Sequence, residues 1–165
     1  MITDMTTGQF RVCITNRSIQ DAALEVSGGL TAEGEPLLVL DACGCFEPSR
    51  LSRSSPQAAR CLHILRVSTA ESMEEIWSKL HNAQRDLQAR QILVVGLLDR
   101  LYDPEILTRD AARALGGIKA RLENLAEAGF DVTVLCENQT GNLGTRAMFL
   151  PSLCAAAHQV SSFAA

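Results

Sequence analysis

The sequence predicts one α/β domain whose sheet is mainly parallel and covered by helices on both faces. Strand-like and helix-like apolar patterns alternate along the 165 residues, which is typical of a βαβ series. Several strand-like runs are almost continuously apolar, as in strands that are buried on both faces. The length fits one domain, and no repeat, low-complexity tract or linker interrupts it. We therefore expect a three-layer α/β/α sandwich in which residues 1–165 form a single domain.

Five segments and a weaker sixth have the composition of strands. Each is rich in aliphatic or β-branched residues and has the length of a single strand. They are Phe10–Thr15, Pro36–Ala42, Cys61–Val67, Gln91–Leu98, Asp131–Cys136 and, more weakly, His158–Ala164.

Helices are expected in the gaps between these strands. The first runs from about Ser18 to Thr31 and contains the pair Gly28-Gly29. The second is preceded by S-T-A-E at Ser68–Glu71, which has the pattern of a capping box. Apolar residues then recur at helical spacing and are expected to pack on the sheet: Met73, Ile76, Trp77, Leu80, Ala83 and Leu87.

A longer helix is expected to begin at Asp103-Pro104-Glu105, with Asp103 as N-cap and Pro104 in the first turn. Gly129 is a natural C-terminal stop. The pair Gly116-Gly117 weakens the helix, so close packing or a bend is expected there. The buried stripe of this helix is expected to contain Leu107, Ala111, Leu115, Ile118, Leu122 and Leu125.

Composition excludes several classes of protein. The net charge of −4 argues against a surface that grips nucleic acid as a whole, and 4% aromatic residues provide little material for base stacking. No apolar run is long enough to span a membrane, and the N-terminal sequence lacks the pattern of a signal peptide. We therefore expect a cytoplasmic protein with no membrane association, whose six cysteines are reduced thiols.

The segment VLDACGCFEPSRL, Val39–Leu51, is the most specific feature of the chain. It resembles the strand-loop-helix element of RecA/RadA-type recombinases, in which an apolar strand precedes D-x-E-G-x-F-x-P-x-R-L. QILVVGLLDRLYD resembles the Walker B strand and exit loop of that family, and DVTVLCENQ resembles the strand before its second DNA-binding loop. The resemblance spans about residues 9–139 and implies a RecA-like sheet. The matching positions in the first segment are Asp41, Gly44, Phe46, Pro48, Arg50 and Leu51.

The residues that hydrolyse ATP in the resembled family are missing here. A P-loop needs glycines, a lysine and a Ser/Thr, whereas residues 16–23 read NRSIQDAA. The degenerate positions are Asn16, Arg17 and Ser18, where Asn16 or Ser18 is expected to cap a helix. Arg17 is expected to be solvated, although it could contact an anion at the helix N-terminus.

Two further positions of that machinery have changed. Cys43 stands where the family has the glutamate that activates water, and Gly96 stands where the Walker B aspartate would hold magnesium. Asp99 lies three residues further on, past the expected end of the strand. We therefore expect that the protein is not an ATPase, has no catalytic residues and binds no nucleotide, metal or other cofactor.

Cys43-x-Cys45 also suggests metal or redox chemistry. No second cysteine pair stands at zinc-like spacing, so a metal site is not expected. Cys43 could instead act as a nucleophile in an altered pocket, but neither His63, in a strand, nor His81, on a helix, is evidently paired with it. An enzyme that uses Cys43 therefore stays an alternative. Three other cysteines fall in predicted strands and are expected to be buried: Cys13, Cys61 and Cys136.

The candidate contacts with a partner or with DNA come from three segments. The densest basic cluster lies near Arg66. Because the net charge is negative, we interpret it as a solvated helix face rather than as a DNA-binding patch. The segments that correspond to the family's DNA-binding loops are short and contain one arginine each, so DNA binding is expected to be weak at most. The candidates are Arg50, Arg53 and Arg60 of the cluster, Asn138 and Gln139 after the fifth strand, and Arg146 in the second loop.

The resemblance implies a non-catalytic accessory protein of DNA recombination or repair. It would bind another RecA-fold protein, or itself as a homo-oligomer, through the surfaces that stack in recombinase filaments. In that family the nucleotide lies between neighbouring subunits, so a site without catalytic residues can persist as a protein interface. The alternative is an inhibitor or regulator of an unrelated partner, similar to the cell-division inhibitor SulA.

Overall fold

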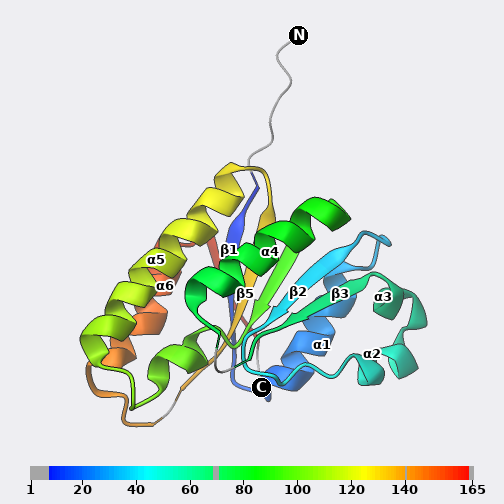
Figure 1. Ribbon diagram of the computed structural model, residues 1–165. Coiled ribbons are helices and arrows are strands. Elements are labelled where there is room, and N and C mark those ends of the chain that lie inside the picture. Colours follow the sequence, from blue (N-terminus) through cyan, green and yellow to red (C-terminus); the bar gives the residue numbers. More distant parts are fainter. Residues whose placement is uncertain (1–7, 69–70, 140, 164–165) are drawn as a thin grey trace.

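The computed structural model (Figure 1) describes residues 8–68, 71–139 and 141–163. Strands and helices alternate along most of this part of the chain. The strands are β1 Phe10–Thr15, β2 Leu37–Asp41, β3 Leu62–Arg66, β4 Gln91–Val95, β5 Asp131–Glu137 and β6 Gln159–Phe163. The helices are α1 Ile19–Leu30, α2 Pro48–Ser54, α3 Pro56–Arg60, α4 Met73–Leu87, α5 Thr108–Glu127 and α6 Phe149–Ala156, with short 3-10 helices η1 Leu98–Tyr102 and η2 Gly144–Met148.

All six strands pair in parallel in the order β3-β2-β4-β5-β1-β6. The expected mainly parallel α/β sheet is therefore confirmed, including the weak sixth strand, whose last predicted residue lies outside the described part. β2 and β4, the most continuously apolar segments, lie inside the sheet and have helices on both faces, which removes nearly all their side chains from water. β3 and β6 form the two edges.

The sheet separates two hydrophobic cores. One face packs against α4, α5 and α6, which contribute Ile76, Leu115 and Leu153 among other residues. The opposite face packs against α1, which contributes Ile19 and Ala22. Figure 1 shows α1 and α4 on opposite sides of the sheet, as a three-layer sandwich requires.

The longest helix begins later than expected. Asp103 caps a turn, because its Oδ1 accepts the amide of Glu105 at 2.9 Å. The helix α5 starts only at Thr108, with Leu107 as its N-cap residue. Leu107 was expected in the buried stripe but is 57% exposed. The prediction was wrong because Asp-Pro is as favourable in a turn as at a helix start.

The capping box of α4 lies four residues after the predicted one. Ser72 Oγ accepts the amide of Glu75, and the Glu75 carboxylate accepts the amide of Ser72. In the predicted box, the Glu71 carboxylate accepts the Ser68 amide at 3.3 Å and also pairs with Lys79, and residues 69–70 lie outside the described part. The apolar stripe behind it is confirmed, with Ile76, Trp77 and Leu80 buried.

The glycine pair Gly116-Gly117 does not mark close packing, since a Cβ built at either position meets nothing within 4 Å. The helix continues through both residues. Within the described residues, the helices lack the combination of length and apolar character needed to cross a bilayer.

Candidate functional site

The candidate site lies where β1, β2, β4 and β5 end, which we call the carboxyl edge of the sheet. In open parallel sheets, ligands bind outside this edge because loops and helix N-termini converge there. The residues that end these strands are Thr15, Asp41, Val95 and Glu137. The site therefore consists of the segments that follow them.

Three residues connect β1 to α1: Asn16, Arg17 and Ser18. The Thr15 hydroxyl accepts the Arg17 amide at 3.0 Å, so this amide already has a partner. Ser18 occupies the N-cap position but makes no side-chain capping bond. Such a short connection leaves no length of backbone to wrap phosphates, which a P-loop requires.

The side chains of this connection bind protein groups. Asn16 Oδ1 accepts the Asn138 side-chain amide at 2.9 Å, which ties the end of β1 to the end of β5. The Arg17 guanidinium forms an ion pair with Glu25 on α1. Of the two expected caps, Ser18 rather than Asn16 holds the N-cap position, although neither makes a side-chain capping bond. The Arg17 side chain is 37% exposed, so it is partly solvated while it pairs with Glu25.

Asp41 organises the loop after β2. Its side chain is fully buried, and its two carboxylate oxygens accept the amides of Cys45 at 3.2 Å and Phe46 at 3.1 Å. Gly44, within this turn, has a φ of +69°, which only glycine adopts without strain. The turn returns the chain towards the sheet, so that Phe46 is buried under α1.

Cys43 and Cys45, both partly exposed in this turn, form a disulfide. The expectation that all cysteines are reduced is therefore wrong for this pair, since Gly44 lets the loop fold so tightly that the two sulfur atoms meet. Together with Asp41, the pair offers three potential metal-ligating atoms within 4.8 Å of one another. A sulfur atom in a disulfide is not a thiolate, so these residues fit a metal only when the pair is reduced.

Cys43 occupies the space that a side chain at position 96 would need. Gly96 follows β4 with a φ of +72°, and a Cβ built on it would lie 2.5 Å from both Cβ and Sγ of Cys43. No side chain fits there unless the loop after β2 moves. The resemblance expects a glutamate at position 43 and an aspartate at position 96. Instead, the Cys43 side chain packs directly against the backbone of Gly96.

Asp99 also lies close to this contact, because its Oδ2 is 3.3 Å from the Cβ position of Gly96. It belongs to η1, past the end of β4, as expected from the sequence. Burial raises the pKa of this carboxyl, and the Glu137 carboxylate raises it further. Its environment therefore disfavours the charged form that a magnesium ligand needs.

Tyr102 and Cys136 lie near Asp99 and interact with it electrostatically. Burial raises the pKa of Tyr102 to about 12, with smaller contributions from Cys136 and Asp99. Burial also raises the pKa of the Cys136 thiol, as expected for a cysteine inside β5. Both groups stay neutral near neutral pH, and neither is a good nucleophile there.

Asn138 and Gln139 line a pocket of about 290 Å³ beside β1, η2 and α6. Tyr102 and Cys154 also face it. Both amide residues are exposed at the end of β5, so they stay candidates for contact with a partner.

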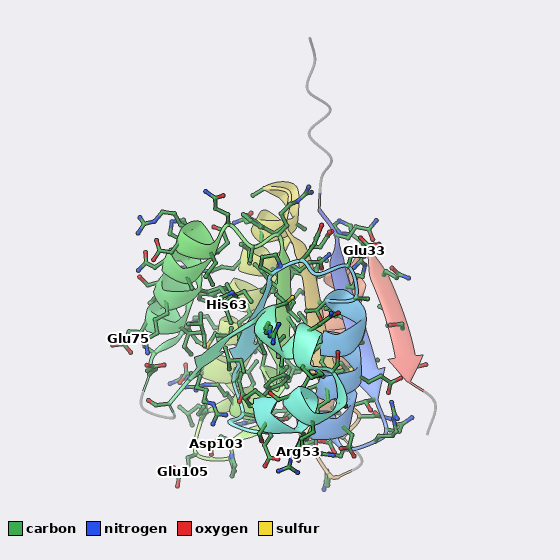
Figure 2. All side chains as sticks on the ribbon, turned by 90° about the vertical axis from the view of Figure 1, so that its right-hand side faces the viewer. Glu33, Arg53, His63, Glu75, Asp103 and Glu105 are labelled. Atoms are coloured by element: carbon green, nitrogen blue, oxygen red, sulfur yellow. A yellow bond between two sulfur atoms is a disulfide. The ribbon has the colours of Figure 1, made fainter. Side chains whose placement is uncertain are left out.

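The arginine cluster is exposed on α2 and α3. Arg50 forms a 2.8 Å ion pair with Asp21 on α1, while Arg53 and Arg60 lie on the surface. Figure 2 shows Arg53 on the outer side of α2. Arg66 donates to the carbonyl of Phe46 at 2.9 Å, so it supports the loop after β2.

Arg146 is not a surface contact. Its side chain is buried, and its guanidinium donates to the backbone carbonyls of Leu101, Asp103 and Ile106. The expectation of a DNA or partner contact at this position is wrong, because the arginine ties the segment after η1 to η2.

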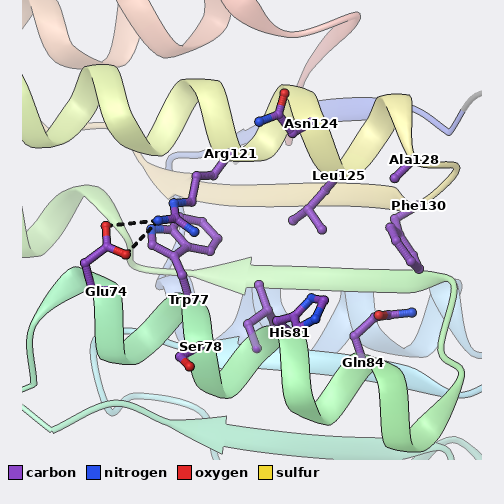
Figure 3. Close-up of a pocket in the computed structure, with 11 residues that line it drawn as sticks. Glu74, Trp77, Ser78, His81, Gln84, Arg121, Asn124, Leu125, Ala128 and Phe130 are labelled. Atoms are coloured by element: carbon purple, nitrogen blue, oxygen red, sulfur yellow. Dashed lines mark hydrogen bonds and ion pairs between the residues drawn. The ribbon is translucent and has the colours of Figure 1, made fainter.

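A hollow of about 690 Å³ lies between α4 and α5 (Figure 3) rather than at the carboxyl edge. Arg121 from α5 makes two bonds to the Glu74 carboxylate and lies 5.9 Å over the Trp77 ring. His81 and Leu125 line the hollow further along the two helices. Its main charged groups thus satisfy each other, and the hollow does not have the features of a phosphate site.

Within the described residues, no hydrogen bond joins one of the remaining cysteines to a histidine. Cys13 is buried in β1, whereas Cys61 caps the end of α3 instead of lying in β3. His63 lies on the edge strand β3, and His81 is exposed on α4. Since Cys43 is bonded to Cys45, it is not a free thiol nucleophile in this state.

Comparison with known proteins supports the fold assignment. No protein-family model and no curated protein sequence matches the chain. Among solved structures, it is similar to the crystal structure of the RadB recombinase, with a TM-score of 0.65 and 11% sequence identity. The match covers 97% of this chain and 78% of the RadB chain. The chain has a RecA-like fold. At this identity the similarity concerns the fold and does not extend to function.

Within the RecA-like fold, sequence reasoning missed three features of the site. Asp41 was only a motif match, and its bonds to the amides four and five residues further on were not foreseen. The burial of Arg146 gave no local signal. The contact between Cys43 and Gly96 joins residues far apart in the chain, so only the RecA-like strand order brings them together.

Proposed function

We propose that this chain is a non-catalytic RecA-like domain that binds a protein partner in DNA recombination or repair. The observation that carries the proposal is the contact of Cys43 with Gly96, which leaves no room for a carboxylate at position 96. The three-residue connection between β1 and α1 supports it, because phosphate binding needs a longer backbone loop there. Phosphoryl transfer depends on positioning and charge neutralisation. The positions that match the family's P-loop lysine, glutamate and aspartate hold other residues in this sequence.

The similarity to a recombinase supports the choice of process. RadB is described as a recombinase, and a related fold without the nucleotide machinery is suited to act through contacts with such proteins. The partner in this proposal is another RecA-fold protein or a second copy of this chain.

The edge strand β3 is the surface best suited to such a contact. Among the described residues it pairs only with β2, and Figure 2 looks onto this side of the molecule. Leu62, Ile64 and Leu65 are only partly buried. The strand contains neither lysine nor proline, the residues that commonly protect sheet edges from association. An extended segment of a partner could add to this edge through backbone hydrogen bonds.

The test is to replace His63, at the centre of β3, with lysine. His63→Lys places a charge on the edge where a partner strand would pair, so we expect roughly tenfold weaker association. Self-association is measured by sedimentation equilibrium. Partners that co-purify from the source cells are identified by mass spectrometry, and their affinities are measured with purified components.

His81→Lys, on the exposed surface of α4, is the matched control because it adds the same charge elsewhere. A RecA-fold partner, or self-association, that is lost in His63→Lys and kept in His81→Lys supports the proposal. Equal binding by both variants contradicts the role of β3. A partner unrelated to recombination contradicts the proposed process and favours the regulator of an unrelated protein.

A further inference from the structure

The loop after β2 carries a cysteine pair that the proposed function does not use. Cys43 and Cys45 are bonded to each other across Gly44, with Cα atoms 5.4 Å apart. Both residues are partly exposed and Gly44 is exposed, so a small thiol can approach the bond. The loop lies at the carboxyl edge of the sheet, where α/β proteins place their reactive groups.

A structural role explains this disulfide poorly. Cross-links stabilise mainly by restricting the unfolded chain, and their effect falls as the closed loop becomes shorter. Here the bond joins residues separated by two positions. The turn is already held by the bonds from the Cys45 and Phe46 amides to Asp41. The disulfide therefore adds little to the stability of the loop.

The groups around the two sulfur atoms can accept hydrogen bonds from the thiols of the reduced state. Asp41 Oδ1 lies 3.6 Å from Cys43 Sγ and 4.0 Å from Cys45 Sγ, so each thiol has an acceptor after reduction. Because backbone amides fix this carboxylate, the acceptor keeps its position in both states. Asp99 is a second carboxyl near the pair: its Oδ2 lies 3.3 Å from the Cβ position of Gly96, which itself lies 2.5 Å from Cys43 Sγ.

We propose that Cys43 and Cys45 form a dithiol–disulfide centre that exchanges with low-molecular-weight thiols or with protein dithiols. The thiolate of the substrate attacks one sulfur atom, the Cys43–Cys45 bond breaks, and a mixed disulfide forms. The released cysteine thiolate takes a proton. A second substrate thiolate then attacks the substrate sulfur of the mixed disulfide and releases the other cysteine. In total, two thiols become one disulfide while the protein disulfide becomes two thiols.

The four other cysteines set the baseline for counting thiols. Cys13, Cys61, Cys136 and Cys154 are free thiols. Protein purified without reductant should therefore contain four titratable thiols after unfolding, and six after prior reduction, since the chain has six cysteines. Peptide mapping should place the bond between Cys43 and Cys45.

The decisive experiment equilibrates the folded protein with mixtures of reduced and oxidised glutathione and counts its thiols after acid quenching. We expect a reversible transition between four and six thiols that follows the glutathione ratio. Cys43→Ser and Cys45→Ser should each abolish the transition. Cys61→Ser, which removes a partly exposed free thiol, should keep it at the same glutathione ratio, now between three and five thiols. Cys45→Ser keeps the test valid if Cys43→Ser, at the contact with Gly96, does not fold.

Three results would overturn the proposal. One is a native protein with six free thiols under air. Another is a disulfide that glutathione reduces only after unfolding. The third is a purified protein that holds zinc through two thiolates, since these sulfur atoms would then serve as metal ligands.

Discussion

Replacing Gly96 with alanine is expected to destabilise the protein by about 3 kcal/mol. The new Cβ would lie 2.5 Å from two atoms of Cys43, and the backbone has a φ of +72°. Overpacking in a well-packed region costs about 1–3 kcal/mol, and a left-handed backbone conformation adds about 1–2 kcal/mol for a residue with a Cβ. Urea denaturation followed by circular dichroism measures the loss in the free energy of unfolding.

Two matched glycines separate these contributions. Gly34 also has a positive φ, +79°, but a Cβ there meets nothing within 4 Å, so Gly34→Ala should cost only about 1–2 kcal/mol. Gly116 lies in open space within α5, so Gly116→Ala should stabilise the helix by about 0.5–1 kcal/mol. If Gly96→Ala costs no more than Gly34→Ala, then Cys43 does not fill the space beside Gly96.

Replacing Arg146 with methionine is expected to cost about 3 kcal/mol. The guanidinium donates to three backbone carbonyls, with a distance of 2.7 Å to Leu101 O. A bond from a charged group contributes about 1.5–3 kcal/mol, and buried carbonyls left without a donor add a penalty. Methionine keeps much of the volume but donates no hydrogen bond. The same urea titration measures the effect.

Two further arginine variants control for charge and geometry. Arg146→Lys should recover only part of the stability, because one ammonium group cannot reach three carbonyls with the fixed geometry of a guanidinium. Arg53→Ala, on the exposed face of α2, should change the stability by less than about 0.5 kcal/mol. Equal losses for Arg146→Met and Arg53→Ala would mean that Arg146 does not hold the segment after η1.

The sheet could be predicted from the sequence because its signal is local. β2 and β4 are almost uninterrupted aliphatic runs, and a strand buried on both faces needs this composition. Even the edge strand β6 kept enough β-branched and aromatic character to be recognised. Alternation with helices then favours a parallel sheet, since each crossover needs a helix.

Helix starts were harder to predict because several segments carried the same signal. Ser68 and Ser72 are each followed by a glutamate three residues later, but only Ser72 has a described, complete capping box. Asp103 had the features of an N-cap and instead stabilises a turn. Tertiary packing decides between such local alternatives, and a single sequence does not contain it.

The site was only partly predictable for a related reason. Positions 43 and 96 were recognised individually by resemblance to a motif. Their mutual contact depends on the pairing of β2 with β4, which brings the two loops together. The burial of Arg146 depends in the same way on the path of the segment after η1.

The proposed function requires that the segments after β1, β2 and β4 do not bind a nucleotide. The most direct test is a titration of the ¹⁵N-labelled protein with ATP and Mg²⁺, monitored by two-dimensional NMR. We expect no saturable shift of the Arg17, Cys45 and Gly96 amides up to roughly 1 mM nucleotide, the upper range of typical substrate affinities. Saturable shifts centred on these three amides would contradict it.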